Sequence, residues 1–139
     1  FYSSEFYTRK MQEYIMASQE SGKPFFSYMA YTAPHWPLQA LPETIKIYRG
    51  KYDEGYDKLH KARIASAIKA GVISSNSPAT IPRASWMTPW DKLNDDAKKY
   101  ESRKMEVYAA MIHDLDVYIG QLIDTLKEQG VLNNTIIFA

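Results

Sequence analysis

Pro24-Phe25-Phe26-Ser27-Tyr28-Met29-Ala30-Tyr31 is the most informative run for the fold of this 139-residue chain. It is short, aromatic and apolar, which is typical of a strand whose two faces are both mostly covered. The residues before it, from about Ser4 to Gln19, carry apolar side chains at three- and four-residue spacings, and Gly22 follows. That pattern predicts an amphipathic helix with Ser3 or Ser4 as its N-cap. Residues 1–31 are therefore predicted to form a helix–turn–strand unit.

The C-terminal part of the chain repeats this order. A helix is predicted from about Asp95 to Gln129, about 50 Å long, and Gly130 ends it. A turn and an apolar, β-branched run follow, which predicts a strand over 134–139. Two helix–strand units in one chain predict an α/β fold with a largely parallel sheet. The apolar stripe of the predicted helix comprises Met105, Tyr108, Met111, Ile112, Leu115, Ile119, Leu122, Ile123 and Leu126.

Residues 32–94 form a long, irregular middle that contains six of the seven prolines. Within it a helix is predicted over about 53–70, and the residues from about Val72 to Trp90 are expected to form a loop. So much loop is unusual in a compact domain, and it is typical of an insertion that covers a site on a larger body. We therefore expect this chain to be one piece of a larger protein.

The composition excludes several classes of protein. Apolar residues make up 45% of the chain and charged residues 24%, as in a folded protein rather than a disordered tail. The formal net charge of +1 gives no electrostatic argument for binding nucleic acid. No apolar run approaches the ~20 residues that a membrane span needs. Cysteine is absent, which excludes disulfides, zinc sites built on thiolates and a cysteine nucleophile within these residues.

His35 is the strongest candidate for chemistry because it follows the first predicted strand, in Thr32-Ala33-Pro34-His35-Trp36-Pro37-Leu38. In parallel α/β sheets, ligands bind in the loops just past the carboxyl ends of strands. An imidazole there can bind an anion when it is protonated, or give a proton to a leaving group. The alternative is a histidine that only completes a turn beside Trp36.

The other titratable residues carry weaker signals. His60 lies among lysines on a predicted helix, where a solvated surface position is expected. His113 and Asp114 lie in the long helix and are predicted to be structural, because this pair falls short of a metal site. The sequence contains no phosphate-binding loop, nucleophile elbow or HExxH motif, and no set of metal ligands is predicted.

Taken together, these runs resemble the sulfatase family, and arylsulfatases in particular. The segment from Pro24 to Gln39 is similar to the family segment that ends at an active-site histidine. Similar runs follow in the family's order and approximate spacing over nearly the whole chain. They are Tyr48-Arg49-Gly50-Lys51-Tyr52-Asp53, Trp90-Asp91-Lys92-Leu93, Arg103-Lys104-Met105-Glu106-Val107-Tyr108-Ala109-Ala110-Met111, Ile119-Gly120 and Asn134-Thr135-Ile136-Ile137-Phe138.

The resemblance implies a partial alkaline-phosphatase-like α/β fold, with residues 1–139 as an internal segment of the catalytic domain. It implies a sulfuric ester hydrolase whose formylglycine nucleophile and Ca²⁺ ligands lie outside these residues, so the segment alone is expected to be inactive. It assigns His35 to sulfate binding and to protonation of the leaving group. The substrate would be a small-molecule or carbohydrate sulfate ester, with Trp86 and Trp90 as candidate pocket residues, although packing remains an alternative for both.

Two further interpretations stay open. A phosphodiesterase or phosphonate monoester hydrolase of the same superfamily would share the scaffold and the metal chemistry. A non-enzymatic helical interaction module would use the long helix to bind a partner. The family also suggests an extracytoplasmic location, and the remainder of its own chain as the main partner of this segment.

Overall fold

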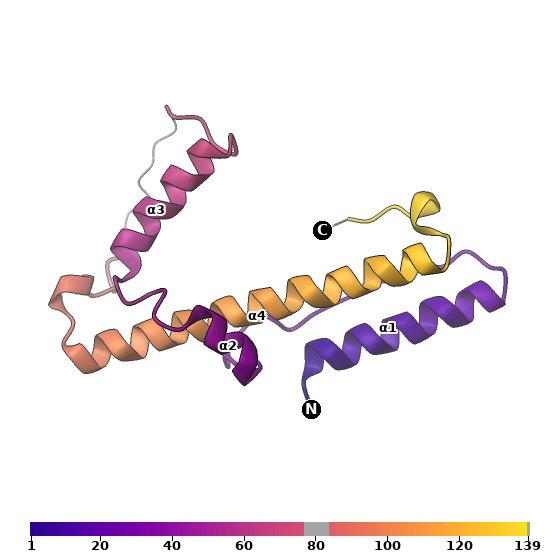
Figure 1. Ribbon diagram of the computed structural model, residues 1–139, viewed down its shortest axis with the longest axis horizontal. Coiled ribbons are helices and arrows are strands. Elements are labelled where there is room, and N and C mark those ends of the chain that lie inside the picture. The colour runs from indigo at the N-terminus through magenta and orange to yellow at the C-terminus, as the bar shows by residue number, and fades with distance from the viewer. Residues whose placement is uncertain (77–83, 139) are drawn as a thin grey trace.

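The computed structural model describes residues 1–76 and 84–138, and these residues are largely helical. Within these described residues, four α-helices and two short 3₁₀ turns follow one another (Figure 1). Their bounds are α1 Ser3–Glu20, α2 Pro42–Tyr48, α3 Tyr56–Lys69, η1 Trp90–Lys92, α4 Asp95–Glu128 and η2 Leu132–Asn134.

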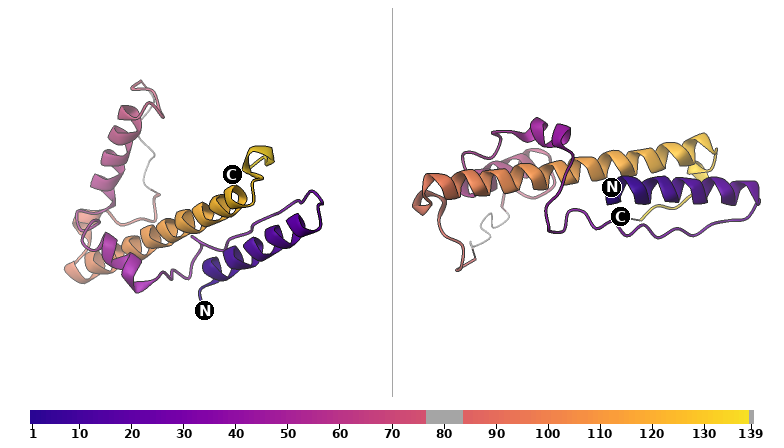
Figure 2. Two further views of the ribbon diagram at one scale, coloured as in Figure 1. Left: turned by 45° about the vertical axis from the view of Figure 1, so that its right-hand side comes forward. Right: turned by 90° about the horizontal axis from the view of Figure 1, so that it is seen from below.

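Helix α4 is the structural axis of the molecule. Helix α1 packs alongside the C-terminal half of α4 and runs in the same direction. Tyr2, just before α1, contacts Asp114, and Gln12 contacts Gln121 and Thr125 further along α4. Helix α2 packs across the middle of α4. Helix α3 projects away from this body as an arm in Figure 1 and in the left view of Figure 2.

The long helix begins and ends where its sequence predicts. The Asn94 side chain accepts a hydrogen bond from the backbone N–H of Ala97 at 2.8 Å, which caps the first turn. Two aspartates lie in that turn and Lys127 lies in the last one, as the helix dipole favours. Helix α1 is confirmed as well, but its N-cap residue is Tyr2, which makes no side-chain cap, so the predicted serine cap is wrong.

The predicted α/β fold with a parallel sheet is wrong for the described residues. Residues 23–31 and 135–138 are extended, yet among residues 1–76 and 84–138 there is no strand and no sheet. Phe26 is 94% exposed and Phe138 is 90% exposed, so these runs are not covered on both faces. The apolar runs predict extended backbone correctly, but a strand also needs a neighbour that pairs with its N–H and C=O groups. The local sequence does not specify that neighbour.

The buried face of α4 also differs from the predicted apolar stripe. Of that stripe only Met111 and Leu126 are buried, whereas Ile112, Ile119 and Ile123 remain exposed. The face that packs on α1 and α2 is mostly polar or small, and its buried residues are Ser102, Glu106, Ala110, Met111, Asp114, Tyr118, Thr125 and Leu126. Polar side chains can be buried here because partners across the interface satisfy their hydrogen bonds.

The middle of the chain is more helical than predicted. Helix α2 lies where only loop was expected, and Pro42 begins it at a position that proline tolerates well. Helix α3 lies within the predicted 53–70 helix, although none of its residues is buried. Part of the predicted 72–90 loop, residues 77–83, lies outside the described residues. In the part of the chain that the structure describes, no helix combines the length and hydropathy needed to cross a bilayer.

Candidate active-site loop

His35 lies in a tight turn between the extended segment 23–31 and helix α2. The backbone N–H of His35 donates to the carbonyl of Thr32 at 2.9 Å, which closes the turn. The imidazole is exposed and stacks on the ring of Trp36, with centroids 5.8 Å apart. Prolines at 34 and 37 fix two backbone φ angles, so the sequence itself stiffens this loop. The histidine is therefore presented to solvent on a restrained support.

A backbone hydrogen bond fixes which nitrogen of His35 is free to react. Nδ1 lies 2.6 Å from the Trp36 carbonyl oxygen. A carbonyl can only accept, so Nδ1 must carry the hydrogen of this bond. Nε2 is then the lone-pair nitrogen of the neutral ring and a second donor in the protonated ring. It can bind an anionic oxygen or transfer a proton, while Nδ1 holds the ring in place.

Two hydroxyl pairs attach the start of the His35 loop to helix α1. The Tyr31 hydroxyl lies 2.6 Å from Oγ1 of Thr8, which is only 1% exposed. The Thr32 hydroxyl lies 3.3 Å from the hydroxyl of Ser3. These four residues, Ser3, Thr8, Tyr31 and Thr32, form what we call the loop clamp.

A buried carboxylate lies behind the clamp. Asp114 of α4 is 5% exposed and accepts hydrogen bonds from the Tyr2 hydroxyl at 3.0 Å and from the Thr44 hydroxyl at 2.6 Å. Tyr2 directly precedes α1 and Thr44 belongs to α2, so one carboxylate joins three helices. Burial raises the pKa of the Tyr2 hydroxyl far above its ordinary value, and the Asp114 charge raises that pKa further. Tyr2 therefore stays a neutral donor.

Further contacts attach the end of α2 and the residues after it to α4. Tyr48 contacts His113, with its hydroxyl 3.1 Å from Nδ1. The buried Glu106 carboxylate accepts a hydrogen bond from the backbone N–H of Gly50 at 2.8 Å, and Arg103 pairs with its other oxygen at 2.8 Å. The structural role predicted for His113 fits these contacts. The solvated position predicted for His60 does not hold, because Nε2 of His60 is buried and has no hydrogen-bond partner within the described structure.

Of the two candidate tryptophans, Trp90 lies at the start of the arm, against Tyr56 and Gly55. Trp86 is 83% exposed. Trp90 is half-buried, meets the Tyr56 ring edge-on at 5.4 Å and lies directly over Gly55. Within residues 1–76 and 84–138, no hydrogen bond or ring contact joins either tryptophan to His35. Their substrate-binding role stays a prediction.

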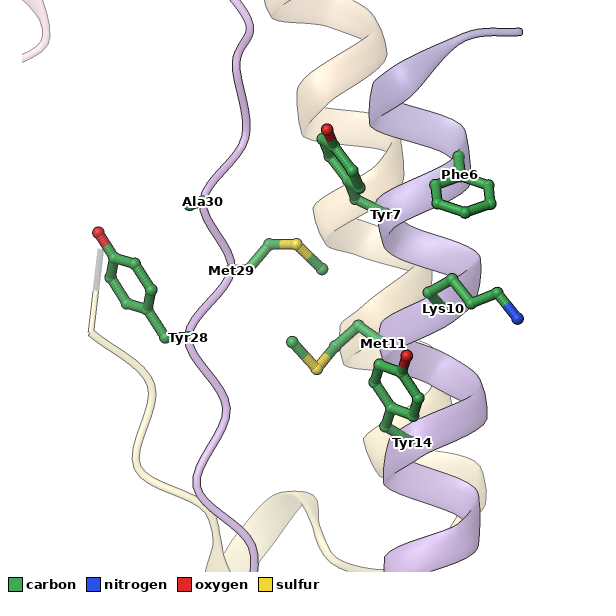
Figure 3. A pocket seen from close by; sticks show the side chains of 8 residues that line it. All are labelled: Phe6, Tyr7, Lys10, Met11, Tyr14, Tyr28, Met29 and Ala30. Carbon is green, nitrogen blue, oxygen red and sulfur yellow. The ribbon is translucent and has the colours of Figure 1, made fainter.

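A shallow groove of about 350 Å³ lies between α1 and the extended segment before the His35 loop. Its walls are mainly apolar and aromatic, and Figure 3 shows Met11 and Met29 pointing toward each other across it. Tyr28 points away on the other side of the extended segment. Since no histidine or carboxylate lines the groove, it offers no chemistry of its own.

The described residues do not provide a calcium site. Among them, no three or more histidine, aspartate or glutamate side chains lie close enough together to hold a metal ion. The buried carboxylates Glu106 and Asp114 are already occupied by hydrogen-bond donors from the chain itself. Calcium, which the family resemblance implies, does not fit these residues.

Sequence reasoning proposed His35 as a site residue and missed the residues that hold its loop. One signal was available: Ser4, Thr8 and Ile15 fall on one face of α1, and all three are buried. Residues four apart share one face of a helix, so this spacing indicates a common face whose small side chains leave room for a neighbouring segment. The identity of that neighbour, Tyr31, required the three-dimensional structure.

Comparisons with known proteins extend over the whole chain. A family model described as Sulfatase matches residues 1–139. An arylsulfatase of Klebsiella aerogenes is 41% identical over 137 residues, which is 99% of this chain and 29% of that protein. An uncharacterized sulfatase of Schizosaccharomyces pombe is 42% identical over 138 residues, or 99% of this chain and 24% of that protein. Arylsulfatase J of Mus musculus is 44% identical over 48 residues, which is 34% of this chain and 8% of that protein. The chain thus spans less than a third of the length of each of these relatives.

Proposed function

The chain belongs to the sulfatase family, and on that premise we propose that the whole protein is an arylsulfatase-like sulfuric ester hydrolase. The net reaction consumes one water and releases an alcohol or phenol together with inorganic sulfate. Support comes from the family match over the full chain and from a relative named as an arylsulfatase at 41% identity.

His35 is the residue through which this segment takes part. The observation that carries the proposal is the 2.6 Å contact between Nδ1 and the Trp36 carbonyl, which leaves Nε2 for the substrate. When the bond from sulfur to the ester oxygen breaks, negative charge develops on that oxygen. A proton from Nε2 neutralises this charge, and before cleavage the same N–H donates to a sulfate oxygen.

The other catalytic groups come from elsewhere in the whole protein. The 139 residues contain no cysteine and no serine in a Cys/Ser-x-Pro/Ala-x-Arg run, which is the motif that sulfatases oxidise to formylglycine. We therefore assign both the formylglycine nucleophile and the Ca²⁺ ligands to residues outside this segment. When bound, the calcium ion would supply positive charge for the sulfate oxygens.

The substrate and the setting of the reaction follow from the same assignment. The substrate is a small-molecule or carbohydrate sulfate ester, and the exposed Trp86 offers an aromatic surface to a ring in that substrate. Trp90 would support that surface from its packed position on Gly55. Sulfatases are commonly extracytoplasmic or lysosomal, and we place the whole protein outside the cytoplasm.

Steady-state kinetics of the whole protein with aryl sulfates test this function. His35→Ala should lower kcat by about 10²- to 10⁴-fold, because general acid catalysis is lost. His35→Asn is the sharper variant, since its amide N–H can replace Nδ1–H toward Trp36 but cannot replace Nε2. It should be nearly as inactive as the alanine variant.

His60→Gln, on the distant arm, is the matched histidine control and should keep wild-type kcat. Trp86→Ala should act on KM rather than on kcat. Wild-type kinetics for both His35 variants would remove this residue from the chemistry. Faster cleavage of a phosphate diester than of the matching sulfate monoester would assign the protein to another branch of the superfamily.

A further inference from the structure

We propose that Tyr31 is a positioning residue for His35, acting through its hydrogen bond to Thr8 of helix α1. This inference rests on the proposed function of His35. Tyr31 lies four residues before the imidazole, at the point where the extended segment enters the active-site loop.

The direction of the hydrogen bond follows from counting hydrogens. The Thr8 hydroxyl donates its single hydrogen to the backbone carbonyl of Ser4 at 2.8 Å. It can then only accept from Tyr31, so the Tyr31 phenol is the donor in the 2.6 Å contact. Burial raises the pKa of the Tyr31 hydroxyl, which keeps the donor protonated. Removing this one hydroxyl therefore removes the bond and leaves Thr8 satisfied.

The path from the clamp to the imidazole is short and stiff. The next residue, Thr32, contacts Ser3 through its side chain and accepts the His35 N–H through its carbonyl. Pro34 fixes its own φ angle, and Ala33 is restricted because it precedes a proline. A shift of the chain at Tyr31 is therefore passed on to the His35 ring rather than absorbed between them.

The support under the clamp is rigid as well. Thr8 is buried at the α1 surface, and α1 is fixed to α4 at its start by the bond from Tyr2 to Asp114. The far side of the loop is fixed to the same carboxylate through Thr44. Both ends of the His35 loop are thus connected to the buried Asp114 carboxylate, one through α1 and one through Thr44. The Tyr31–Thr8 bond fixes where the loop begins with respect to that carboxylate.

A purely structural role for Tyr31 predicts a different kinetic signature. Loss of stability would lower the amount of active enzyme equally for every substrate. Displacement of a proton donor instead costs most where the leaving oxygen needs the proton most. The dependence of kcat on leaving-group basicity therefore separates the two roles.

The test measures kcat of the whole protein with a series of aryl sulfates, from 4-nitrophenyl sulfate to 4-methoxyphenyl sulfate. Tyr31→Phe should lower kcat roughly tenfold for the most basic leaving group and much less for 4-nitrophenol. Thr8→Val, which removes the acceptor hydroxyl, should reproduce this effect. Thr8→Ser, which keeps a hydroxyl, should give wild-type values. Tyr28→Phe, in the same extended segment but with an outward-pointing ring, is the matched control and should change nothing.

The double variant His35→Ala/Tyr31→Phe links the clamp to its target. It should be no slower than His35→Ala alone, because Tyr31 acts through the imidazole. If kcat of Tyr31→Phe depends on the leaving group as in the wild type while His35→Ala is impaired, the positioning role of Tyr31 is overturned. The proposed function of His35 then still stands. An unimpaired His35→Ala would overturn the proposed function, and the clamp with it.

Discussion

The two halves of the connecting segment between α1 and α4 are held in very different ways. Residues 32–53 are fixed repeatedly to the helical body, through Thr32, Thr44, Tyr48, Gly50 and Asp53. Residues 54–76 and 84–93 form the α3 arm, whose side-chain contacts mainly join residues within the arm itself. Examples are the ion pair of Lys58 with Glu54 and the hydrogen bond from the Tyr56 hydroxyl to the Thr88 carbonyl.

This contrast shows that helix formation and anchoring are separate properties of the sequence. Helix α3 forms with no buried residue, whereas the seven-residue α2 buries both Thr44 and Ile45 against α4. Short helices gain most of their stability from tertiary packing, so α2 is stable because it is anchored. The part of the segment that carries His35 is the anchored part.

Removal of the Asp114 carboxylate should give the largest effect on stability. Asp114→Ala leaves the hydroxyls of Tyr2 and Thr44 without their acceptor inside the body, and we expect the free energy of unfolding to fall by about 3 kcal/mol. Urea denaturation of the whole protein measures this change. Asp116→Ala, at an exposed position of the same helix, should cost less than about 0.5 kcal/mol. Equal losses of stability for both variants would mean that the buried Asp114 carboxylate contributes no more to stability than the exposed Asp116 carboxylate.

A smaller effect is expected in the arm, at Gly55. This glycine has a φ of +84° and its backbone lies against Trp90, where an added Cβ would come 2.1 Å from the ring. Gly55→Ala should destabilise the arm by about 2 kcal/mol, through backbone strain and displacement of the indole.

Gly71 is the matched control for this substitution. Its φ is +72°, but none of the described residues lies within 4 Å of an added Cβ, so Gly71→Ala carries only the strain of about 1 kcal/mol. Hydrogen exchange of the α3 amides and Trp90 fluorescence measure the difference between the two variants. If they behave alike, the arm is not organised around the contact between Trp90 and Gly55.

The smallest effect is a change in the alkaline stability of the body. Burial and the Asp114 charge raise the pKa of Tyr2 above its ordinary value of 10.0 in the folded state. Below pH 10 the phenol is neutral in both states. Above it, the unfolded chain loses this proton first, so stability falls as pH rises.

Tyr2→Phe should remove this alkaline loss while costing about 1 kcal/mol at neutral pH through the missing hydrogen bond. Thermal unfolding at pH 8 to 11 compares it with Tyr100→Phe, which replaces an exposed tyrosine. A wild-type pH profile for Tyr2→Phe would show that the phenol titrates as if it were exposed.

Local signals predicted part of this structure, and non-local pairing accounts for the rest. The bounds of the long helix were predicted correctly, because the features that set them, among them the Asn94 cap, the first-turn aspartates and Gly130, act within a few residues. The sheet was wrong because an apolar run such as residues 24–31 specifies an extended backbone and not its neighbour. The packed face of α4 was wrong because Glu106 and Asp114 are buried with partners that lie more than 50 residues away in sequence.

The candidate site divides in the same way. The prolines and the strand-like run placed His35 in a loop from sequence alone. The roles of Thr8 and Tyr31 depend on a contact across 23 residues that no spacing rule encodes.

The bond between His35 and the Trp36 carbonyl also sets an order of events. With Nδ1 occupied, the ring has a single exchangeable site facing the substrate, so it cannot take up a proton on one side while releasing another on the opposite side. Under the proposed function, the alcohol formed by cleavage would occupy the space in front of Nε2. The same nitrogen would then have to release the product before it could meet the next substrate, so product release and substrate entry would occur at one face of the ring.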